Sequence, residues 1–284
     1  MIAKPRNAFG LNGATLPTSD ILTGIRVAGA AGFCYYEPRI PELDGSQGQI
    51  REGTVFAALK DAAVDWLPLN ALEGLFSSTP RVLNEDAKRT FALAARFGVK
   101  TVIAVPGPAG GSVDRAEAVL QLGRLNAMAK EHGVSLLYEF LGFPHCAFPS
   151  LDAARTLAAE AELPLVLDTF HLAVGQTPRH AIERLHASEI GLIHLSDALA
   201  STGDLTGVVD ADRVLPGEGQ LALSEIVRAI QSTGYDGPVS VEVFHPMYGE
   251  RAPEDVAVYA FRRATALLAG AVDGTGARKG NPVN

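Results

Sequence analysis

Residues 135–197 contain three short apolar runs: SLLYEF at 135–140, PLVLDTFH at 164–171 and LIHLSD at 192–197. Each run has the length and apolar character of a strand that is buried on both faces. Each also carries, at or near its end, a residue able to bind a metal or move a proton: Glu139, Asp168 and His194. The separations of 29 and 26 residues match one strand–helix–strand unit each, so the runs predict consecutive parallel strands.

The same arrangement continues in PVSVEVF at 238–244, where Glu242 lies near the end of a fourth run. The 48 residues that separate it from His194 leave room for one more unit with an extended loop. Parallel strands joined by helices bring their C-terminal ends to one side of a sheet or barrel. The four side chains should therefore converge, and the alternative is a set of scattered strand-end charges. Three carboxylates and one imidazole predict a metal-dependent enzyme with one Mn²⁺ or Mg²⁺, and Co²⁺ or Zn²⁺ as alternatives.

Strand-like and helix-like runs alternate along the rest of the chain. Besides the four runs above, we expect strands at 8–11, 33–37, 64–72 and 101–107. We expect helices at 21–32, 53–63, 80–97, 114–132, 150–161, 178–186, 221–233 and 253–271. Eight alternating units predict an α/β fold, a single (β/α)₈ TIM barrel. The barrel should span 1–271 as one catalytic domain, followed by a disordered tail at 272–284 that is rich in Gly and Asn.

The overall composition excludes several classes of protein. A length of 284 residues suits one barrel, which typically needs ~250. The formal net charge of −8 argues against a nucleic-acid partner, because a phosphate backbone requires a basic face. No run approaches the ~20 apolar residues of a membrane span, and the first residues lack an apolar signal region. Cys34 and Cys146 are too few for a disulfide framework, so we expect reduced thiols in a cytoplasmic protein.

Two further residues are candidates for contact with a substrate. His171 follows Asp168 by three residues, so it either hydrogen-bonds a substrate oxygen or is an ordinary histidine in the first turn of a loop or helix. Arg213 belongs to DADRVLPGEG at 210–219, within a long connection at 197–219 that we interpret as a partial lid. It either pairs with Asp210 or Asp212 at the surface or folds back to clamp substrate oxygens.

Three residues at the predicted rim could also hydrogen-bond a polyol. Glu37 ends the run CYYE, and Asn70 lies in LPLNAL at the end of the third strand. Asparagine at a strand end is otherwise a turn or cap former. His245 precedes Pro246, so its backbone should be extended, and its side chain could point toward the site or toward solvent.

Several familiar motifs are missing from the sequence. No GxGxxG or GKS/T loop is present, so no cradle for a nucleotide phosphate is predicted. No Ser–His–Asp order suggests a hydrolase triad. Lysines and arginines do not cluster as they would for a phosphate pocket, which favours a neutral polyol or sugar over a sugar phosphate.

The motifs YEFLGFPHC, LVLDTFH, LIHLSD and DADRVLPGEG resemble those of the sugar isomerase/epimerase superfamily with a xylose isomerase-like barrel. Within that group the chain is most similar to the bacterial inosose isomerases, which act on keto-inositols. The resemblance implies that Glu139, Asp168, His194 and Glu242 bind one divalent metal, and that Glu139 and Glu242 double as acid/base groups. It also implies substrate contacts for His171 and Arg213, and leaves room for a homo-oligomer, because similar barrels are often dimers or tetramers.

The chain departs from these relatives at two rim positions. Gly13 stands where similar enzymes often have an acidic residue, and His245 stands where they often have an arginine. Both departures affect the expected substrate rather than the expected metal site.

The residues predict a divalent-metal-dependent enzyme, and the resemblance implies an isomerase or epimerase of an inosose-type keto-polyol or keto-sugar. A carboxylate would remove a proton next to a carbonyl, and the metal would stabilise the resulting enediolate. If that species expels a β-leaving group, the enzyme is a lyase instead: an inosose dehydratase or an enzyme that cleaves 3-keto-glycosides. A metal-dependent endonuclease would need more ligands and a basic face. A barrel that only binds would tolerate loss of the ligands, so both of these are less favoured.

Overall fold

The computed structural model describes residues 8–108, 113–200, 204–205 and 207–270. The tail expected at 272–284 lies outside these residues. Nine strands form one sheet, and its paired strands run parallel. In spatial order they are β3 (Asp65–Trp66), β2 (Tyr35–Glu37), β1 (Phe9–Asn12), β11 (Val239–Val241), β8 (Ile190–Leu195), β7 (Leu165–Asp168), β6 (Ser135–Glu139), β5 (Thr101–Pro106) and β4 (Leu69–Leu75).

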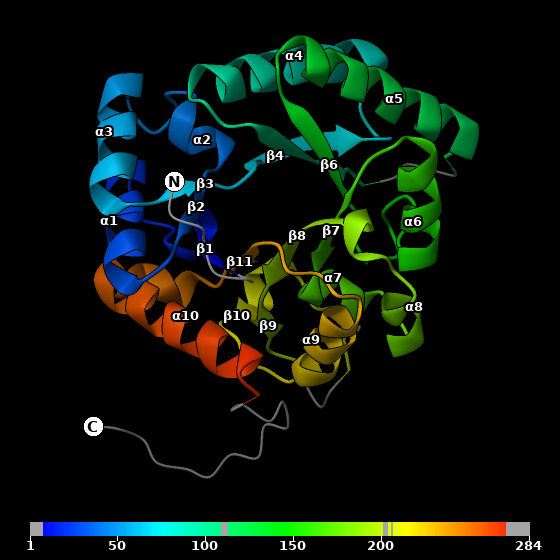
Figure 1. The fold of residues 1–284 in the computed structure, drawn as a ribbon. Helices are drawn as coiled ribbons and strands as arrows, with labels where there is room; N and C mark the ends of the chain where they lie inside the picture. The colour runs from blue at the N-terminus through cyan, green and yellow to red at the C-terminus, as the bar shows by residue number, and fades with distance from the viewer. Residues whose placement is uncertain (1–7, 109–112, 201–203, 206, 271–284) are drawn as a thin grey trace.

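Helices surround this sheet in a ring (Figure 1). They are α1 (Ile21–Ala31), α3 (Glu52–Ala62), α4 (Pro80–Arg96), α5 (Arg115–Glu131), α6 (Leu151–Glu160), α8 (Arg179–Glu183), α9 (Leu223–Ser232) and α10 (Pro253–Leu268). Asp20 and Asp114 begin α1 and α5, because each carboxylate accepts a hydrogen bond from the backbone three residues later. Among the described residues, no helix is both long enough and apolar enough to cross a membrane.

The sheet closes into a barrel through one divided strand. β3 and β4 lie at opposite ends of the strand order, yet only Leu67 and Pro68 separate them in the chain. Proline cannot donate a ladder hydrogen bond, so the strand predicted at 64–72 divides there. β3 pairs with β2 and β4 pairs with β5, while a backbone bridge joins Arg39, just after β2, to Asn70 of β4. The predicted (β/α)₈ barrel is confirmed.

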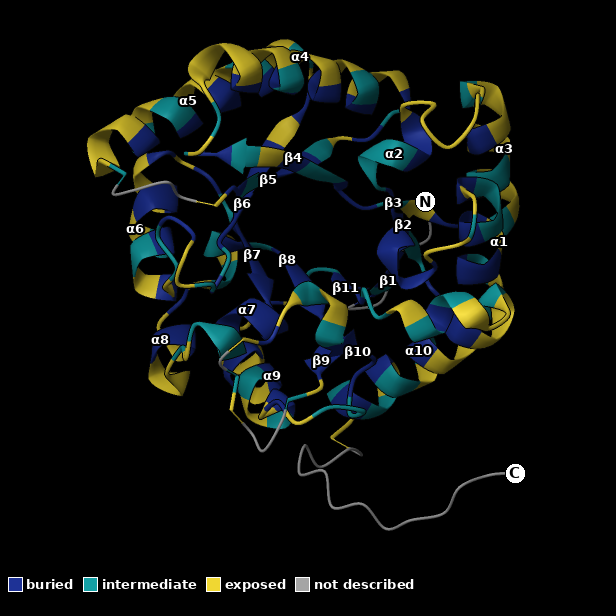
Figure 2. Cartoon of the chain, turned by 180° about the vertical axis from the view of Figure 1, so that it is seen from behind, coloured by how far each residue is buried: buried dark blue, intermediate teal, exposed yellow. Residues whose placement is uncertain are grey.

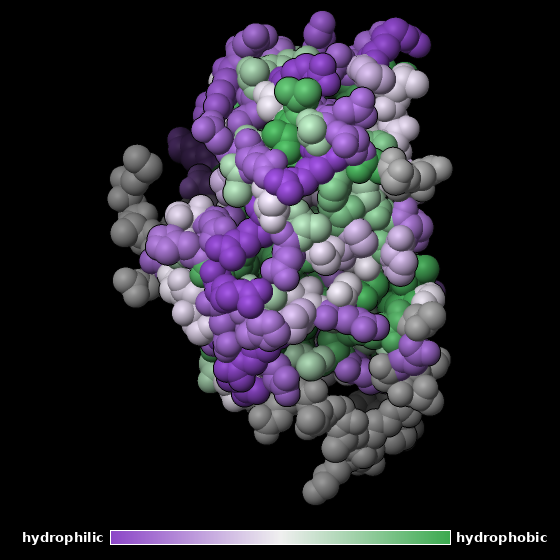
Figure 3. All heavy atoms as spheres, turned by 90° about the vertical axis from the view of Figure 1, so that its right-hand side faces the viewer, coloured by the Kyte–Doolittle hydropathy of each residue, from purple (hydrophilic) through white to green (hydrophobic). Residues whose placement is uncertain are grey.

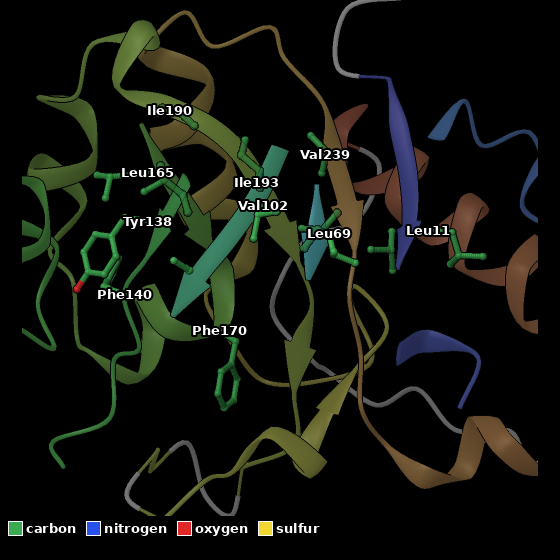
Figure 4. Close-up of a cluster of buried hydrophobic side chains, with 14 of the residues drawn as sticks. Leu11, Leu69, Val102, Tyr138, Phe140, Leu165, Phe170, Ile190, Ile193 and Val239 are labelled. Atoms are coloured by element: carbon green, nitrogen blue, oxygen red, sulfur yellow. The ribbon is translucent and has the colours of Figure 1, made fainter. Parts of the chain in front are cut away.

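Alternate residues of the strands pack into two separate apolar layers. One layer lies inside the barrel and contains Leu67, Ile103, Leu137, Val166 and Leu192. The other fills the space between strands and helices, and Figure 4 shows several of its members. The strands and the inner helix faces are buried, whereas the outer helix faces are exposed (Figure 2) and largely hydrophilic on the side seen in Figure 3.

The structure departs from the sequence prediction in several short elements. A helix, α7 (Thr169–Val174), begins directly after Asp168, where the sequence left a loop and a helix open, and the helix predicted at 178–186 shortens to α8. A four-residue helix, α2 (Ile40–Leu43), follows β2. The long connection at 197–219 contains an antiparallel pair, β9 (Asp197–Ala198) and β10 (Arg213–Val214). Short 3₁₀ turns complete the chain: η1 (Gly13–Thr15), η2 (Ala187–Glu189), η4 (Asp210–Asp212) and η5 (Pro246–Glu250).

Candidate metal centre

The four residues predicted as metal ligands lie together at the C-terminal end of the barrel. Glu139 ends β6, Asp168 ends β7, His194 lies in β8 and Glu242 directly follows β11. Asp168 and His194 are register partners, so the two strands bring these side chains level. One ligand atom from each of the four residues lies within 4.8 Å of the other three. All four residues are at least 96% buried, as expected for a ligand set held by a rigid barrel.

The imidazole of His194 is enclosed by three carboxylates. Its Nδ1 lies 3.2 Å from Oε1 of Glu139 and 3.3 Å from Oε2 of Glu242. Its Nε2 lies 2.9 Å from Oε1 of Glu37, which is also fully buried. The two ring nitrogens therefore face different groups, with the cluster of predicted ligands on the Nδ1 side.

Arg213 lies against the same cluster. Its Nη1 donates to Asp168 and lies 3.3 Å from Oε2 of Glu242, and its guanidinium stacks 4.3 Å from the ring centre of Phe170. Nε and Nη2 lie 2.9 and 2.8 Å from Oδ1 of Asp210. Arg213 thus pairs with Asp210, but as a buried residue inside the site and not at the surface. Its contact with substrate oxygens stays a prediction.

Burial of so many acids perturbs their protonation. Burial raises the pKa of Glu242 to about 8, although His194 and Arg213 act to lower it. Burial also raises the pKa of Glu139, against the opposing effect of His194. For Asp168, burial is outweighed by Arg213, His171 and His194, so its pKa lies below the ordinary value. Burial therefore disfavours the charged forms of Glu139 and Glu242, and a cation bound beside them would stabilise those charged forms.

A network of backbone hydrogen bonds delivers Arg213 to the site. The carboxylate of Asp197 in β9 accepts hydrogen bonds from the amides of Ala198, Gly217 and Leu221, at 2.9–3.0 Å. A Cβ on Gly219 would lie 2.2 Å from the carbonyl oxygen of Ala198, so this turn requires glycine. Asp197, the first residue of the predicted partial lid, thus fixes the described end of that connection near residues 217–221.

His171 lies beside Arg213 in α7. Its Nε2 lies 3.0 Å from Nη2 of Arg213, which can only donate. Burial and the neighbouring guanidinium lower the pKa of His171 to about 4, so the ring is neutral at neutral pH and Nε2 accepts. The other nitrogen, Nδ1, carries the hydrogen and has no hydrogen-bond partner among the described residues. This donor supports the predicted contact with a substrate oxygen, which stays a prediction.

The remaining rim residues occupy different surroundings. Nδ2 of Asn70 donates to Glu37 at 2.9 Å and to Glu242 at 2.7 Å, and Asn70 also lines a cavity of about 710 Å³ between α2, β4 and α4. His245 instead caps η5, where its Nδ1 accepts from Met247. Substrate binding by Asn70, Glu37 and His245 stays a prediction, and Asn70 alone of the three joins the cavity to the buried acids.

One residue of the site was missed from the sequence. Asn12 ends β1, is fully buried and donates from Nδ2 to Oε1 of Glu242 at 3.1 Å. The rule that identified Glu139, a polar residue closing an apolar strand, applies equally to Asn12 and could have found it. The next residue, Gly13, lies so near Glu42 that a Cβ would be 2.2 Å from its Oε2. A carboxylate from α2 therefore fills the space beside Gly13.

Comparisons with known proteins agree with the barrel fold. A family model described as Xylose isomerase-like TIM barrel matches residues 31–264. An inosose isomerase of Halalkalibacterium halodurans is 31% identical over 178 residues, 60% of this chain and 62% of that protein. A 3-dehydroshikimate dehydratase of Pseudomonas putida is 26% identical over 81% of this chain and 36% of its own length. A crystal structure of the IolI protein with a bound zinc atom superposes with a TM-score of 0.85 and 24% identity, over 93% of this chain and 98% of the other.

Proposed function

The chain belongs to the xylose isomerase-like TIM barrel family, and from this premise we propose that it is a divalent-metal-dependent isomerase or epimerase. Its substrate would be a keto-polyol or keto-sugar of the inosose type. The observation that carries the proposal is the convergence of Glu139, Asp168, His194 and Glu242 within 4.8 Å. Relatives with the names of isomerases and dehydratases support an enzyme of this class.

The residues present fit a divalent cation. The site holds four buried carboxylates: those of Glu37, Glu139 and Glu242 contact His194, and that of Asp168 contacts Arg213. Among the described residues, Arg213 is the one permanently charged cation that contacts this group, through Asp168 and Glu242. A divalent ion would offset the excess negative charge. The ligand set is rich in oxygen, which favours Mn²⁺ or Mg²⁺, while the zinc in the IolI protein supports a site that also accepts Zn²⁺.

Glu139 and Glu242 would carry the proton transfer. A bound divalent ion supplies Lewis acidity, which makes the hydrogen next to a carbonyl more acidic. Both carboxylates are buried beside His194 and away from bulk water, so their affinity for protons is higher than in solution. One can remove the proton and the other return it, which is typically worth ~10²–10⁴ in rate. Arg213 and His171 would hold substrate oxygens by donating hydrogen bonds.

A lyase is the second candidate, and the dehydratase relatives are the observation that favours it. Removal of the same proton can be followed by loss of a β-hydroxyl group or of an aglycone, which would make the enzyme an inosose dehydratase or a 3-keto-glycoside-cleaving enzyme. The same four ligand positions and the same two acid/base residues would serve this reaction.

A proton NMR time course in D₂O tests the proposal. Protein loaded with Mg²⁺ or Zn²⁺ is incubated with a keto-inositol, with keto-hexoses and with a 3-keto-glycoside. Deuterium entering the carbon beside the carbonyl, with no other change in product mass, is the result expected for an isomerase or epimerase. Loss of water or an aglycone would assign the lyase, and no exchange with any substrate would refute both. A cytoplasmic location, a homo-oligomer and the lack of a nucleic-acid partner stay predictions.

A further inference from the structure

Glu37 lies outside the group of four ligand candidates but contacts one of them directly. It ends β2, is fully buried and places Oε1 2.9 Å from Nε2 of His194. The opposite nitrogen, Nδ1, lies within 3.3 Å of Glu139 and Glu242. His194 is therefore held between one carboxylate behind it and two in front of it.

The chemistry of imidazole gives this arrangement a consequence. A ring nitrogen that binds a cation must present its lone pair, so the other nitrogen carries the hydrogen and can only donate. Glu37 offers an acceptor to Nε2. With a cation bound, the hydrogen would therefore be on Nε2, and the lone pair of Nδ1 would face the side of Glu139 and Glu242.

Asn70 connects Glu37 to a second predicted ligand, Glu242. Its Nδ2 donates both to Oε1 of Glu37 and to Oε1 of Glu242, and Asn12 donates to that same oxygen of Glu242. With Oε1 occupied by two amides, the other oxygen, Oε2, faces His194 and Arg213. Glu37, Asn70 and Asn12 together thus determine which nitrogen of His194 and which oxygen of Glu242 would face a bound cation.

We propose that Glu37 is a positioning residue that fixes His194 as an Nδ1 ligand, and that Asn70 links this constraint to Glu242. The inference rests on the proposed function in one respect, that the four residues bind a divalent cation. Loss of such a partner to a ligating histidine typically costs 10–100-fold in metal affinity. In this role Glu37 would act through His194, in place of the substrate contact predicted for it from the sequence.

The test measures metal affinity without catalysis. Competition with a chelator gives the dissociation constants of Mn²⁺ and Zn²⁺ for wild type, Glu37→Gln, Glu37→Ala and Asn70→Ala. We expect Glu37→Ala to weaken both by roughly 10–100-fold, and Glu37→Gln to lie between it and wild type, because glutamine keeps an acceptor but not the charge. Glu42→Gln is the matched control, since Glu42 is a buried acid from α2 that bonds Tyr36 and the Arg39 amide instead of His194. Its affinity should equal that of wild type.

A second measurement uses only the wild-type protein, so the inference stays testable if the Glu37 variants do not fold. Nitrogen-15 NMR of the Zn²⁺-loaded protein assigns which nitrogen of His194 is protonated. A proton on Nε2 and zinc on Nδ1 is the expected result. Zinc on Nε2, or unchanged affinity in folded Glu37→Ala, would overturn the positioning role while leaving the metal site intact. Absence of any metal binding by wild type would overturn the proposed function and this inference together.

Discussion

Arg213 ties two proposed metal ligands to the loop that delivers it. Its guanidinium donates to Asp168, lies 3.3 Å from Glu242 and stacks on Phe170. We therefore expect Arg213→Ala to lower kcat/KM by roughly 10²-fold or more, the usual cost of removing one positioned charge from an active site. Arg213→Lys should recover little, because an ammonium cannot reproduce the planar fork. Steady-state kinetics on the substrate identified by deuterium exchange would measure this.

The control for that variant is Arg184→Ala, because Arg184 is exposed and lies 3.3 Å from Asp152 in a surface contact. Its kcat/KM should match wild type. If Arg213→Ala were as active as this control, the substrate contact proposed for Arg213 would be wrong.

Glu42 makes a separate prediction about stability and pH. Burial raises its pKa from 4.5 to about 7, against the lowering effect of Tyr36 and Arg39. The folded protein then holds this proton more tightly than the unfolded chain, so the free energy of unfolding should fall as pH rises from about 4.5 to about 7. The shift corresponds to a loss on the order of 3 kcal/mol. Urea unfolding at pH 5 and pH 8 would measure it.

Glu42→Gln isolates this contribution because glutamine cannot titrate. The free energy of unfolding should fall less between pH 5 and pH 8 in Glu42→Gln than in wild type, and the difference between the two losses is the contribution of Glu42. Glu85→Gln, which changes an exposed acid paired with Arg81, should behave as wild type. Identical pH profiles for wild type and Glu42→Gln would contradict the raised pKa.

The sequence could identify the strand-end acids for a simple physical reason. A charged residue at the C-terminal end of an apolar barrel strand lies at the end of the barrel, and Glu139 and Asp168 follow that rule. The roles of residues that contact the predicted ligands, such as Glu37, could not be predicted from the sequence in the same way. Whether Glu37 faces a substrate or the back of His194 depends on how β2 lies relative to β8, two strands that are not neighbours in the sheet.

At the scale of elements, the connection at 197–219 is organised by Asp197. Its carboxylate accepts hydrogen bonds from the amides of Gly217 and Leu221, which lie 20 and 24 residues away in sequence. Asp197→Ala leaves buried amides without acceptors, so we expect a loss of roughly 1–3 kcal/mol in stability and a lower kcat/KM through a misplaced Arg213. Thermal unfolding and kinetics would measure both, and metal affinity should stay near that of wild type.

Asp152→Ala is the control for this variant, because Asp152 is exposed and lies 3.3 Å from Arg184 in a surface contact away from the connection at 197–219. Retention of full activity and stability in Asp197→Ala would show that the loop does not depend on this carboxylate. The sequence predicted a long functional loop but not β9 and β10. A strand of two residues leaves no periodic pattern, and only its pairing across the loop defines it.

Across the whole molecule, alternation of strand and helix signals was sufficient to predict the barrel. Eight units leave few arrangements open, because parallel strands need crossover helices and those crossovers are right-handed. The way in which the barrel closes could not be predicted. The run at 64–72 pairs with two different strands: β3 pairs with β2, and β4 pairs with β5. This division at Pro68 depends on how the two ends of the sheet meet in space, which the sequence pattern does not show.

A buried acidic centre should also couple metal binding to the stability of the whole barrel. The unfolded chain cannot assemble residues from β6, β7, β8 and the end of β11, so a cation binds the folded state alone. At a concentration 100 times its dissociation constant, it should add ~2.7 kcal/mol to the free energy of unfolding and raise Tm by roughly 5 °C. Scanning calorimetry with chelator and then with Mn²⁺, Mg²⁺ or Zn²⁺ would measure the shift. His194→Ala should lose the shift if it folds. Equal Tm values for wild type with and without every one of these ions would refute the metal centre, whatever the enzyme's substrate.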